Sequence, residues 1–578
     1  MKTYYRFIIL ALTVFLINAC DPQYIDPISK VDPGPDEEAP QITVNFPPDD
    51  YELQTNEEPA TINIDFTVTD DIEIDLITLD MDGAEIATFS DFKDYRVAKE
   101  NYIYDNVTTG PHTLTVTATD TEGKSATEIV NFSKAPPYVP QIEGEVFYMP
   151  FNNEFREMNS LELATVIGSP TFADGIQGGT AYKGFQDSYL SFPIDFLQGT
   201  QELSACFWMK VSGTPDRAGI LVVSPPDASN TLRTNGFRFF REAAGGMQRF
   251  KLNVGNGTAD TWFDGGPAAD VTPDTGEWVH FAFTISGSEA VVYINGEVVK
   301  QGAFSGIAWN NCTQLSIMSG APNFTGWNHW SDLGLMDELR IFNKVLTQEA
   351  IQTIILKEKA SFYMDFNGDY KDAVSGDEAT VVGSPGFEYG GGVDGDAYKG
   401  ATDAYLTFPA TDLQASEFSA SFWMKVSATP DRAGILVMGP EDTENPDAQN
   451  DRSSGFRFFR ENAGGMQRFK LNVGDGTADT WFDGGAAADV DPTTGEWVHF
   501  AFAIGLTEAR VYINGTEVKQ GAFNGVDWTG CDILSIMSGA PRFTGWNHKS
   551  DEGLMDELYL FKKALAIEEV TLLMNDGL

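Results

Sequence analysis

The chain has 578 residues, 42% hydrophobic and 21% charged, and its 37 basic and 85 acidic side chains give a formal charge of −48. Its hydrophobic content excludes disorder of the whole chain, and its length predicts about three to five domains. Because a surface this negative repels phosphate backbones and anionic lipid headgroups, we expect no nucleic-acid partner and no electrostatic attachment to a membrane. Neutral ligands and cations remain as candidates.

The first twenty residues predict a signal peptide. Lys2 and Arg6 supply positive charge, and residues 7–17 form an apolar run too short to span a bilayer. Residues 16–20 (LINAC) resemble a bacterial lipobox, which implies removal of residues 1–19 and lipidation of Cys20. A plain secretory signal with an incidental cysteine is the alternative. We expect a protein anchored to the outer membrane through its lipid alone and exposed at the cell surface.

A tether and a small domain follow. Residues 20–40 are rich in Pro, Asp and Glu, which predicts an extended, solvated segment. Residues 41–134 contain short alternating runs between Asp, Gly and Asn turns, a pattern typical of a small antiparallel sandwich. Residues 110–123 (GPHTLTVTATDTEG) resemble the last hairpin of bacterial immunoglobulin-like surface modules. We therefore expect an immunoglobulin-like domain, with a Pro-rich linker at residues 135–140.

The rest of the chain is one domain present twice, as repeat 1 (residues 141–357) and repeat 2 (residues 358–578). The motif AGGMQRFKLNVG occurs unchanged at residues 244–255 and 463–474. The offset between copies changes from 215 before Val222 to 219 after Gly236, so a loop between these points differs in length. Each copy is long enough to close its own core.

Within each repeat, alternating or β-branched runs are separated by Gly or Asn-Gly turns. Helical periodicity is restricted to residues 348–356 and 567–574. The predicted fold class is all-β, with an immunoglobulin-like sandwich followed by two jelly-roll sandwiches. The remaining cysteines, Cys206, Cys312 and Cys531, are odd in number, and Ser421 replaces Cys206 in repeat 2, so we expect buried core residues without a shared disulfide.

Four motifs recur in the same order in both repeats and resemble the laminin-G-like branch of the concanavalin A-like lectin/glucanase superfamily. The motifs are FWMKV, GEWVHFAF, a following YING and MDEL. The combination of lipid anchor, immunoglobulin-like spacer and tandem sandwiches resembles the SusE/SusF-like surface glycan-binding lipoproteins of Bacteroidota. This resemblance implies capture of polysaccharide for uptake, beside an outer-membrane glycan transporter complex. It does not imply which glycan is bound.

All eleven tryptophans lie in the two repeats. An indole buries the CH face of a sugar at low entropy cost, while polar neighbours bind the hydroxyls. Trp262 and Trp481 lie in Gly/Asp-rich turns, where burial is less expected, and are binding candidates. Trp208 and Trp423 lie on patterned strands, and we expect them in the core.

Residues 319–334 (SGAPNFTGWNHWSDLG) look like an aromatic loop inserted into the family pattern, and residues 538–553 are their copy. Trp327, Trp330 and Trp546 are therefore further carbohydrate-binding candidates, with packing of the loop as the alternative. Trp330 is replaced by Lys549 in repeat 2, so we expect the two repeats to differ in affinity or preference.

Strand alternation adds a basic surface. Arg238 and Arg457 point away from the predicted core and are candidates for gripping a glycan, with ion pairs to neighbouring carboxylates as the alternative. Since the bulk surface repels polyanions, an acidic glycan would depend on this local basic face. We therefore favour a neutral polysaccharide.

The family resemblance also implies a structural calcium ion, with Asp337 and Asp556 of the two MDEL motifs as ligands; exposed turn acids are the alternative. Neither repeat contains the paired carboxylates that glucanases of this fold need on one strand face, so we expect no enzymatic activity. The alternatives to glycan binding are adhesion or protein interaction and, after that, a divergent glycosidase.

Overall fold

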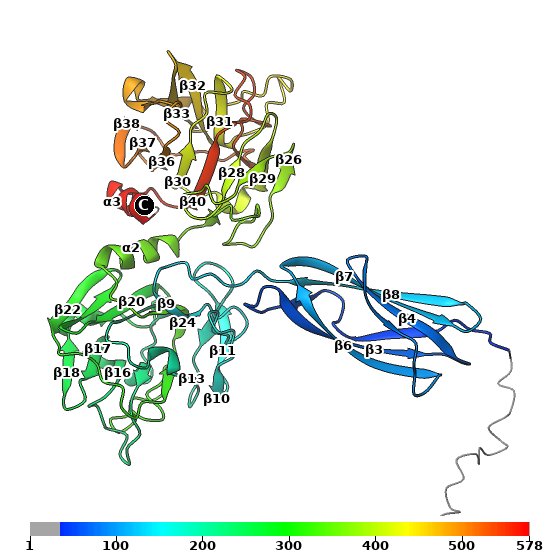
Figure 1. Ribbon diagram of the computed structural model, residues 1–578. Coiled ribbons are helices and arrows are strands. Elements are labelled where there is room, and N and C mark those ends of the chain that lie inside the picture. Colours follow the sequence, from blue (N-terminus) through cyan, green and yellow to red (C-terminus); the bar gives the residue numbers. More distant parts are fainter. Residues whose placement is uncertain (1–34, 577–578) are drawn as a thin grey trace, which may run out of the picture. The chain divides into compact units, whose positions relative to one another are not determined.

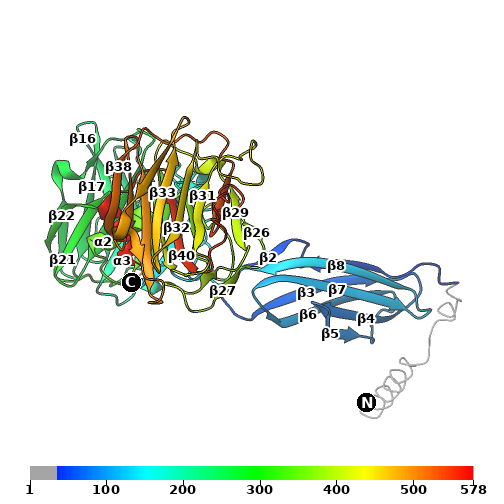
Figure 2. The same ribbon diagram turned by 90° about the horizontal axis from the view of Figure 1, so that it is seen from above.

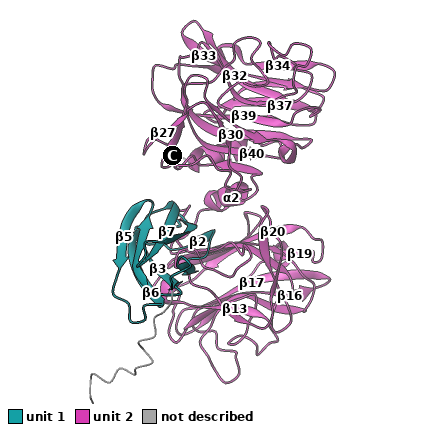
Figure 3. Ribbon diagram, turned by 90° about the vertical axis from the view of Figure 1, so that its right-hand side faces the viewer, with its two compact units in different colours: residues 1–139 teal, residues 140–578 magenta. Residues whose placement is uncertain are grey.

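The computed structural model describes residues 35–576. The predicted signal peptide, the lipidation site Cys20 and residues 20–34 of the tether lie outside the described residues. The chain divides into two compact units, residues 1–139 and 140–578, which Figure 3 colours separately. No helix in the described part is long and apolar enough to cross a membrane.

Unit 1 is a sandwich of two sheets, seen in blue in Figure 1. Its central strands alternate as the sequence predicts: Ile62, Ile64 and Phe66 of β3 enter the core, while Asn63 lies exposed. The first sheet has the order β1 (Gln41–Phe46), β3 (Ala60–Thr69), β6 (Val97–Val107). The second has the order β2 (Tyr51–Leu53), β8 (Ser125–Lys134), β7 (Gly110–Asp120), β4 (Ile74–Met81), β5 (Ala84–Phe89).

Repeat 1 consists of two eight-stranded sheets. The site sheet has the order β10 (Thr165–Ile167), β13 (Tyr189–Pro193), β23 (Gln314–Ile317), β15 (Arg217–Val223), β16 (Phe237–Ala244), β17 (Met247–Gly255), β18 (Asp260–Asp264), with β19 (Asp270–Val271) beside β17. The helix sheet has the order β11 (Thr171–Asp174), β12 (Thr180–Lys183), β24 (Leu335–Phe342), β14 (Leu203–Lys210), β20 (Trp278–Ile285), β21 (Glu289–Ile294), β22 (Glu297–Ala303), with β9 (Glu145–Met149) beside β24.

Repeat 2 has the same two sheets, and Figure 2 shows its strands from above. Its site sheet has the order β26 (Thr380–Val382), β29 (Tyr405–Pro409), β39 (Ile533–Ile536), β31 (Arg432–Met438), β32 (Phe456–Ala463), β33 (Met466–Gly474), β34 (Asp479–Asp483), with β35 (Asp489–Val490) beside β33. Its helix sheet has the order β27 (Gly386–Glu388), β28 (Ala397–Lys399), β40 (Leu554–Phe561), β30 (Phe418–Lys425), β36 (Trp497–Ile504), β37 (Glu508–Ile513), β38 (Thr516–Ala522), with β25 (Phe362–Met364) beside β40. The predicted all-β fold class with tandem sandwiches is confirmed.

Both faces of the helix sheet are covered, which explains why β14 is buried over almost its whole length. Phe207 and Met209 enter the main core, whereas Cys206 belongs to a second cluster with Ile351 and Ile354 of α2 (Gln348–Lys357). The counterpart of α2 in repeat 2 is α3 (Ile567–Asp576), which lies beside it (Figure 1). Both predicted helices are confirmed.

The three cysteines within the described residues are free and buried, as expected. Cys206 and Cys312 lie in apolar clusters of repeat 1. Burial raises the pKa of Cys312 to about 11 and that of Cys531 to about 12, so both thiols stay protonated at neutral pH. These residues fill space in the sandwiches.

Candidate functional site

The outer face of the site sheet is covered by loops, and the aromatic loop at residues 319–334 is one of them. Phe324 of this loop is fully buried against Val222 and Phe240 of the sheet. His329 stacks on Phe324, with ring centroids 4.7 Å apart, and its Nε2 lies 3.2 Å from Glu242 Oε1. Phe324 and His329 therefore serve to pack the loop against the sheet, which is the alternative to ligand binding that the sequence analysis left open.

Two tryptophans of repeat 1 flank this packed layer. On β18, Phe263 enters the core, so the preceding Trp262 faces outward and is 45% exposed. The Trp262 ring meets Phe240 edge to face at 5.6 Å, and Trp327 lies 5.7 Å from Phe324. Both indoles thus rest on the same buried phenylalanine layer.

Arg233 connects the two tryptophans. Its guanidinium carbon lies 4.5 Å from the ring centroid of Trp327 and 5.5 Å from that of Trp262. Arg233 Nε donates to Asp260 Oδ2 at 3.2 Å, and Asn253 Nδ2 donates to the same oxygen at 2.8 Å. We call Trp262, Trp327 and Arg233 the aromatic platform of repeat 1. A flat apolar surface next to a cation is suited to stacking and hydrogen bonding with a polar ring.

Repeat 2 has the same arrangement, and we call Trp481, Trp546 and Arg452 its aromatic platform. Arg452 lies 4.5 Å from the Trp546 ring and 5.7 Å from the Trp481 ring. Its Nε donates to Asp479 at 3.0 Å. Trp481 and Trp546 are 37% and 38% exposed, so about a third of each side chain reaches solvent. In each repeat the structure thus brings together two tryptophans that the sequence analysis gave as separate candidates.

Sequence reasoning missed Arg233 and Arg452. Both lie in the loop whose length differs between the repeats, where local patterns say little about position. A signal was nevertheless present, because each copy keeps an arginine three residues before the Gly that precedes its FRFFR motif.

The predicted glycan contacts of Arg238 and Arg457 are wrong. Both residues face outward from the sheet, but each is fully buried. Arg238 Nη1 donates to the carbonyl of Arg233 at 3.1 Å, and Arg457 Nη1 donates to that of Ser454 at 2.7 Å. Burial lowers the pKa of Arg238 to about 9 and that of Arg457 to about 10. These side chains hold the loop that carries the platform arginine, so they are positioning residues.

The other cations of this face are neutralised. Arg249 makes two hydrogen bonds to the Asp270 carboxylate, of 2.6 and 2.9 Å. Lys251 lies 2.8 Å from Glu242 and 3.1 Å from Asp264. The hydrogen bond from His329, supported by Lys251, lowers the pKa of Glu242 to about 2, so this carboxylate stays charged. Repeat 2 contains the same ion pairs, so neither repeat presents an open basic surface here.

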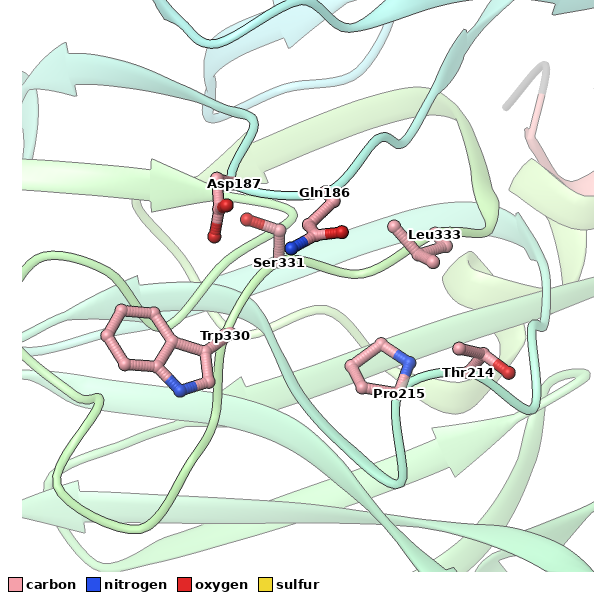
Figure 4. A pocket seen from close by; sticks show the side chains of 7 residues that line it. All are labelled: Gln186, Asp187, Thr214, Pro215, Trp330, Ser331 and Leu333. Carbon is pink, nitrogen blue, oxygen red and sulfur yellow. The ribbon is translucent and has the colours of Figure 1, made fainter.

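Trp330 lies apart from the platform. It is 47% exposed and lines a cavity with residues from two other loops (Figure 4). Its carbonyl accepts a hydrogen bond from Gly219 N at 3.1 Å, which attaches this part of the loop to β15. Two tryptophans that are three residues apart in sequence therefore belong to different surfaces.

Asp337 and Asp556 are buried, so the alternative of exposed turn acids is wrong. Asp337 accepts hydrogen bonds from Ile176 N at 2.8 Å and from its neighbour Glu338 N at 3.1 Å. Burial raises the pKa of Asp556 to about 8, and Asp556 accepts from Val393 N at 2.6 Å. Each carboxylate keeps at least one lone pair beside these N–H donors, so the hydrogen bonds do not exclude an ion, and calcium ligation by Asp337 and Asp556 stays a prediction.

Among residues 35–576, one group of three carboxylates comes close enough to share an ion, that of Asp36, Asp70 and Asp71 in unit 1. Their oxygens lie within 4.8 Å of one another. Lys124 Nζ lies 2.6 Å from Asp36 and thus already supplies a positive charge there. This cluster includes neither Asp337 nor Asp556, so it leaves the calcium prediction at the two MDEL motifs untested.

Comparison with known proteins places the repeats in a family. A family model described as "Concanavalin A-like lectin/glucanases superfamily" matches residues 184–352 and 399–571, one segment in each repeat. Together the two segments cover more than half of the chain. No curated protein matches the chain.

Several solved structures resemble parts of the chain. Domain 4 of an extracellular arabinanase from Geobacillus stearothermophilus, in complex with arabinotriose, is 23% identical, with 36% of this chain and 96% of that chain covered and a TM-score of 0.29. Domains LG4-5 of the mouse laminin α1 chain are 12% identical, with coverages of 66% and 88% and a TM-score of 0.22. The binding domain of botulinum neurotoxin DC, in complex with SialylT, is 9% identical, with coverages of 73% and 99% and a TM-score of 0.29. At these TM-scores the three structures carry no information about what this chain binds.

Proposed function

This chain belongs to the concanavalin A-like lectin/glucanases superfamily, and from that premise we propose that it binds polysaccharide without cleaving it. The observation that carries this proposal is the aromatic platform, present in both repeats. In each platform two partly exposed indoles surround an arginine anchored by an aspartate. Such a surface stacks against the CH face of a sugar, while the guanidinium donates to its hydroxyls.

The charge of the two sites favours a neutral glycan. Arg249, Lys251 and their counterparts are paired with carboxylates, and Arg238 is buried. The platform arginine itself is bonded to Asp260 in repeat 1. An anionic sugar would therefore meet one partly neutralised cation on a protein of charge −48. A neutral sugar carries no charge, so the negative charge of the protein does not weaken its binding.

We further propose that the protein is a surface lipoprotein of the outer membrane, attached through Cys20 and similar in plan to SusE/SusF-like proteins. The immunoglobulin-like domain would serve as a spacer, and an outer-membrane glycan transporter complex would be the partner. Two weak sites on one chain would bind a polymer more tightly than either alone, because the second contact becomes intramolecular.

Affinity electrophoresis tests the proposal. The protein is run in native gels that contain arabinan, galactomannan, xyloglucan or laminarin, with polygalacturonate as the anionic comparison. We expect retardation in at least one neutral gel and its loss in the platform variant, which carries Trp262→Ala, Trp327→Ala, Trp481→Ala and Trp546→Ala. Variants of one repeat should bind at least about tenfold more weakly than the parent. Tyr389→Ala, which removes an exposed aromatic next to β27, is the matched control.

Two results would contradict the proposal. The first is the absence of retardation in every neutral gel, particularly if a protein partner is retained instead. The second is retardation that the platform variant leaves unchanged. A reducing-end assay on the same polysaccharides checks the non-catalytic part, for which we expect no release of sugar.

A further inference from the structure

We propose that repeat 1 contains a second sugar-binding site, the Trp330 pocket, which repeat 2 lacks. The pocket is a cavity of about 400 Å³, within the range typical of small-molecule sites. Its apolar lining comes from Trp330, Pro215 and Leu333, and its polar lining comes from Gln186, Asp187, Thr214 and Ser331. The inference rests on the proposed function, glycan binding, but it uses none of the platform residues.

The walls of the pocket are held in place by backbone hydrogen bonds. Gly184 N donates to the carbonyl of Gly334 at 2.9 Å, which joins the loop of Gln186 and Asp187 to the end of the aromatic loop. Gly219 N donates to the carbonyl of Trp330 at 3.1 Å, which joins the aromatic loop to β15. Because these contacts do not involve the lining side chains, the pocket is preformed. Of the lining groups, Ser331 Oγ is buried and donates to Ser319 Oγ at 3.4 Å.

The lining has the chemistry of a sugar site. In Figure 4 the side chains of Asp187, Gln186 and Ser331 lie along one side of the pocket, and Trp330 and Pro215 lie along the other. The indole offers a flat surface to the CH groups of a sugar ring, and the opposite side offers the carboxylate of Asp187 and the amide of Gln186 to its hydroxyls. The carboxylate of Asp187 disfavours an acidic sugar, so the pocket suits a neutral monosaccharide unit.

Repeat 2 preserves the backbone hydrogen bonds that hold the pocket walls, which we call the frame, but it does not preserve the lining side chains. The equivalent hydrogen bonds are present, from Gly400 N to Gly553 O at 2.9 Å and from Gly434 N to Lys549 O at 3.0 Å. Four side chains around the pocket differ between the repeats. The changes are Phe185 to Ala401, Gln186 to Thr402, Trp330 to Lys549 and Leu333 to Glu552.

These changes replace an apolar surface with a charged one. In repeat 2, Thr402 Oγ1 donates to Glu552 at 2.7 Å, so the polar groups there bind each other. In repeat 1, Phe185 and Trp330 remain 59% and 47% exposed. Since the same frame folds without them, folding does not require these exposed aromatics, and we infer that they were placed for a ligand.

The test measures saturation transfer from the protein to D-glucose, D-galactose, D-mannose, D-xylose and L-arabinose, each in solution with the full chain. It starts from the platform variant, in which both platforms lack their tryptophans. We expect this variant to retain transfer to at least one of the five sugars. Adding Trp330→Lys and Leu333→Glu should abolish that signal. These substitutions introduce residues that repeat 2 already carries in the same frame, so the fold should tolerate them, and an unchanged melting temperature checks this.

The outcomes separate this inference from the proposed function. If the platform variant loses both polysaccharide retardation and sugar transfer, the pocket proposal is contradicted and the platform proposal is supported. If Trp330→Lys with Leu333→Glu abolishes binding and loss of the platform tryptophans has no effect, the platform proposal is contradicted and the pocket proposal is supported. If no variant binds any sugar, both are overturned.

A reciprocal graft gives a gain of signal that a merely structural role would not produce. Thr402→Gln, Lys549→Trp and Glu552→Leu rebuild the lining in repeat 2. In the platform variant without the Trp330 pocket, we expect this graft to restore transfer to the same sugar. A folded graft that restores no transfer would contradict the assignment of the site to these side chains.

Discussion

The indole rings of Trp481 and Trp546 lie 5.8 Å apart, centroid to centroid, with an angle of 31° between their planes. They come from a strand and a loop that are separated by more than sixty residues, and Arg452 lies over both. Arg233 joins Trp262 and Trp327 in the same way. The repeated geometry shows that the platform is a property of the domain and survived a change in the length of the loop that carries the arginine.

The first prediction concerns the shape of the platform cation. Arg452→Lys keeps the charge but removes the planar group that lies over the two indoles, so glycan binding by repeat 2 should weaken by about two- to fivefold. Affinity electrophoresis measures the change in a variant whose repeat 1 platform is disabled. Arg468→Lys is the matched control, because Arg468 pairs with Asp489 on the same sheet and contacts neither tryptophan. Equal effects of the two substitutions would argue against a role for stacking.

The second prediction concerns a buried histidine that differs between the repeats. Ser421 Oγ lies 2.9 Å from His499 Nε2, whereas in repeat 1 the equivalent residue is Cys206 and both ring nitrogens of His280 lack a hydrogen-bond partner among the described residues. Ser421→Cys should therefore lower the free energy of unfolding by about 1 kcal/mol, and Cys206→Ser should raise it by a similar amount. Urea titrations measure both. Cys312→Ser, which places a hydroxyl in the apolar core, should destabilise and so shows the opposite sign.

The third prediction concerns acid. Burial lowers the pKa of His280 and of His499 to about 3, whereas histidine in an unfolded chain titrates near about 6.5. As the pH falls below about 6.5, the unfolded chain binds protons that the folded chain does not bind. The free energy of unfolding is therefore highest above that pH and falls progressively as the pH drops to about 3, by on the order of 5 kcal/mol per histidine.

Urea titrations at about pH 7 and about pH 4.5 measure this loss. His280→Phe removes one of the two groups and should flatten the dependence of the free energy of unfolding on pH. Identical slopes for the variant and the parent protein would show that His280 does not remain neutral in the folded state.

The fourth prediction concerns calcium. The Asp337 and Asp556 carboxylates accept hydrogen bonds from backbone N–H groups of the loops at residues 176 and 393–394. Each carboxylate keeps at least one free lone pair, so if the calcium ion that the family resemblance implies binds there, added CaCl₂ should raise the melting temperature and EDTA should reverse the rise. The rise should disappear in Asp337→Asn with Asp556→Asn, and a parent protein whose melting temperature does not respond to calcium would contradict the assignment.

Much of the fold was predictable because its patterns are local. The alternation of β17 places Phe250, Leu252 and Val254 in the core. Trp262 is exposed, as the sequence favours, but it lies on strand β18 and not in the expected turn. The burial of Arg238, in contrast, could not be predicted from alternation. Alternation assigns it to the outer face, but whether that face meets water depends on a loop folded over it, and the loop's carbonyls bind the guanidinium.

Taken alone, the sequence determined the two sandwiches, their repeat relation and the candidate tryptophans, because strand periodicity and the internal repeat depend only on the order of residues along the chain. The tertiary structure alone decided which of these side chains meet. Arg233 reaches Trp262 because Asp260 holds it there. Trp327 packs against Phe324, whereas Trp330, which follows the turn at Asn328 (φ of 64°), is bound through its carbonyl to Gly219 N, so the two tryptophans belong to different surfaces. Contacts between segments far apart in sequence, and the turn that separates neighbours, depend on the packing of the whole domain.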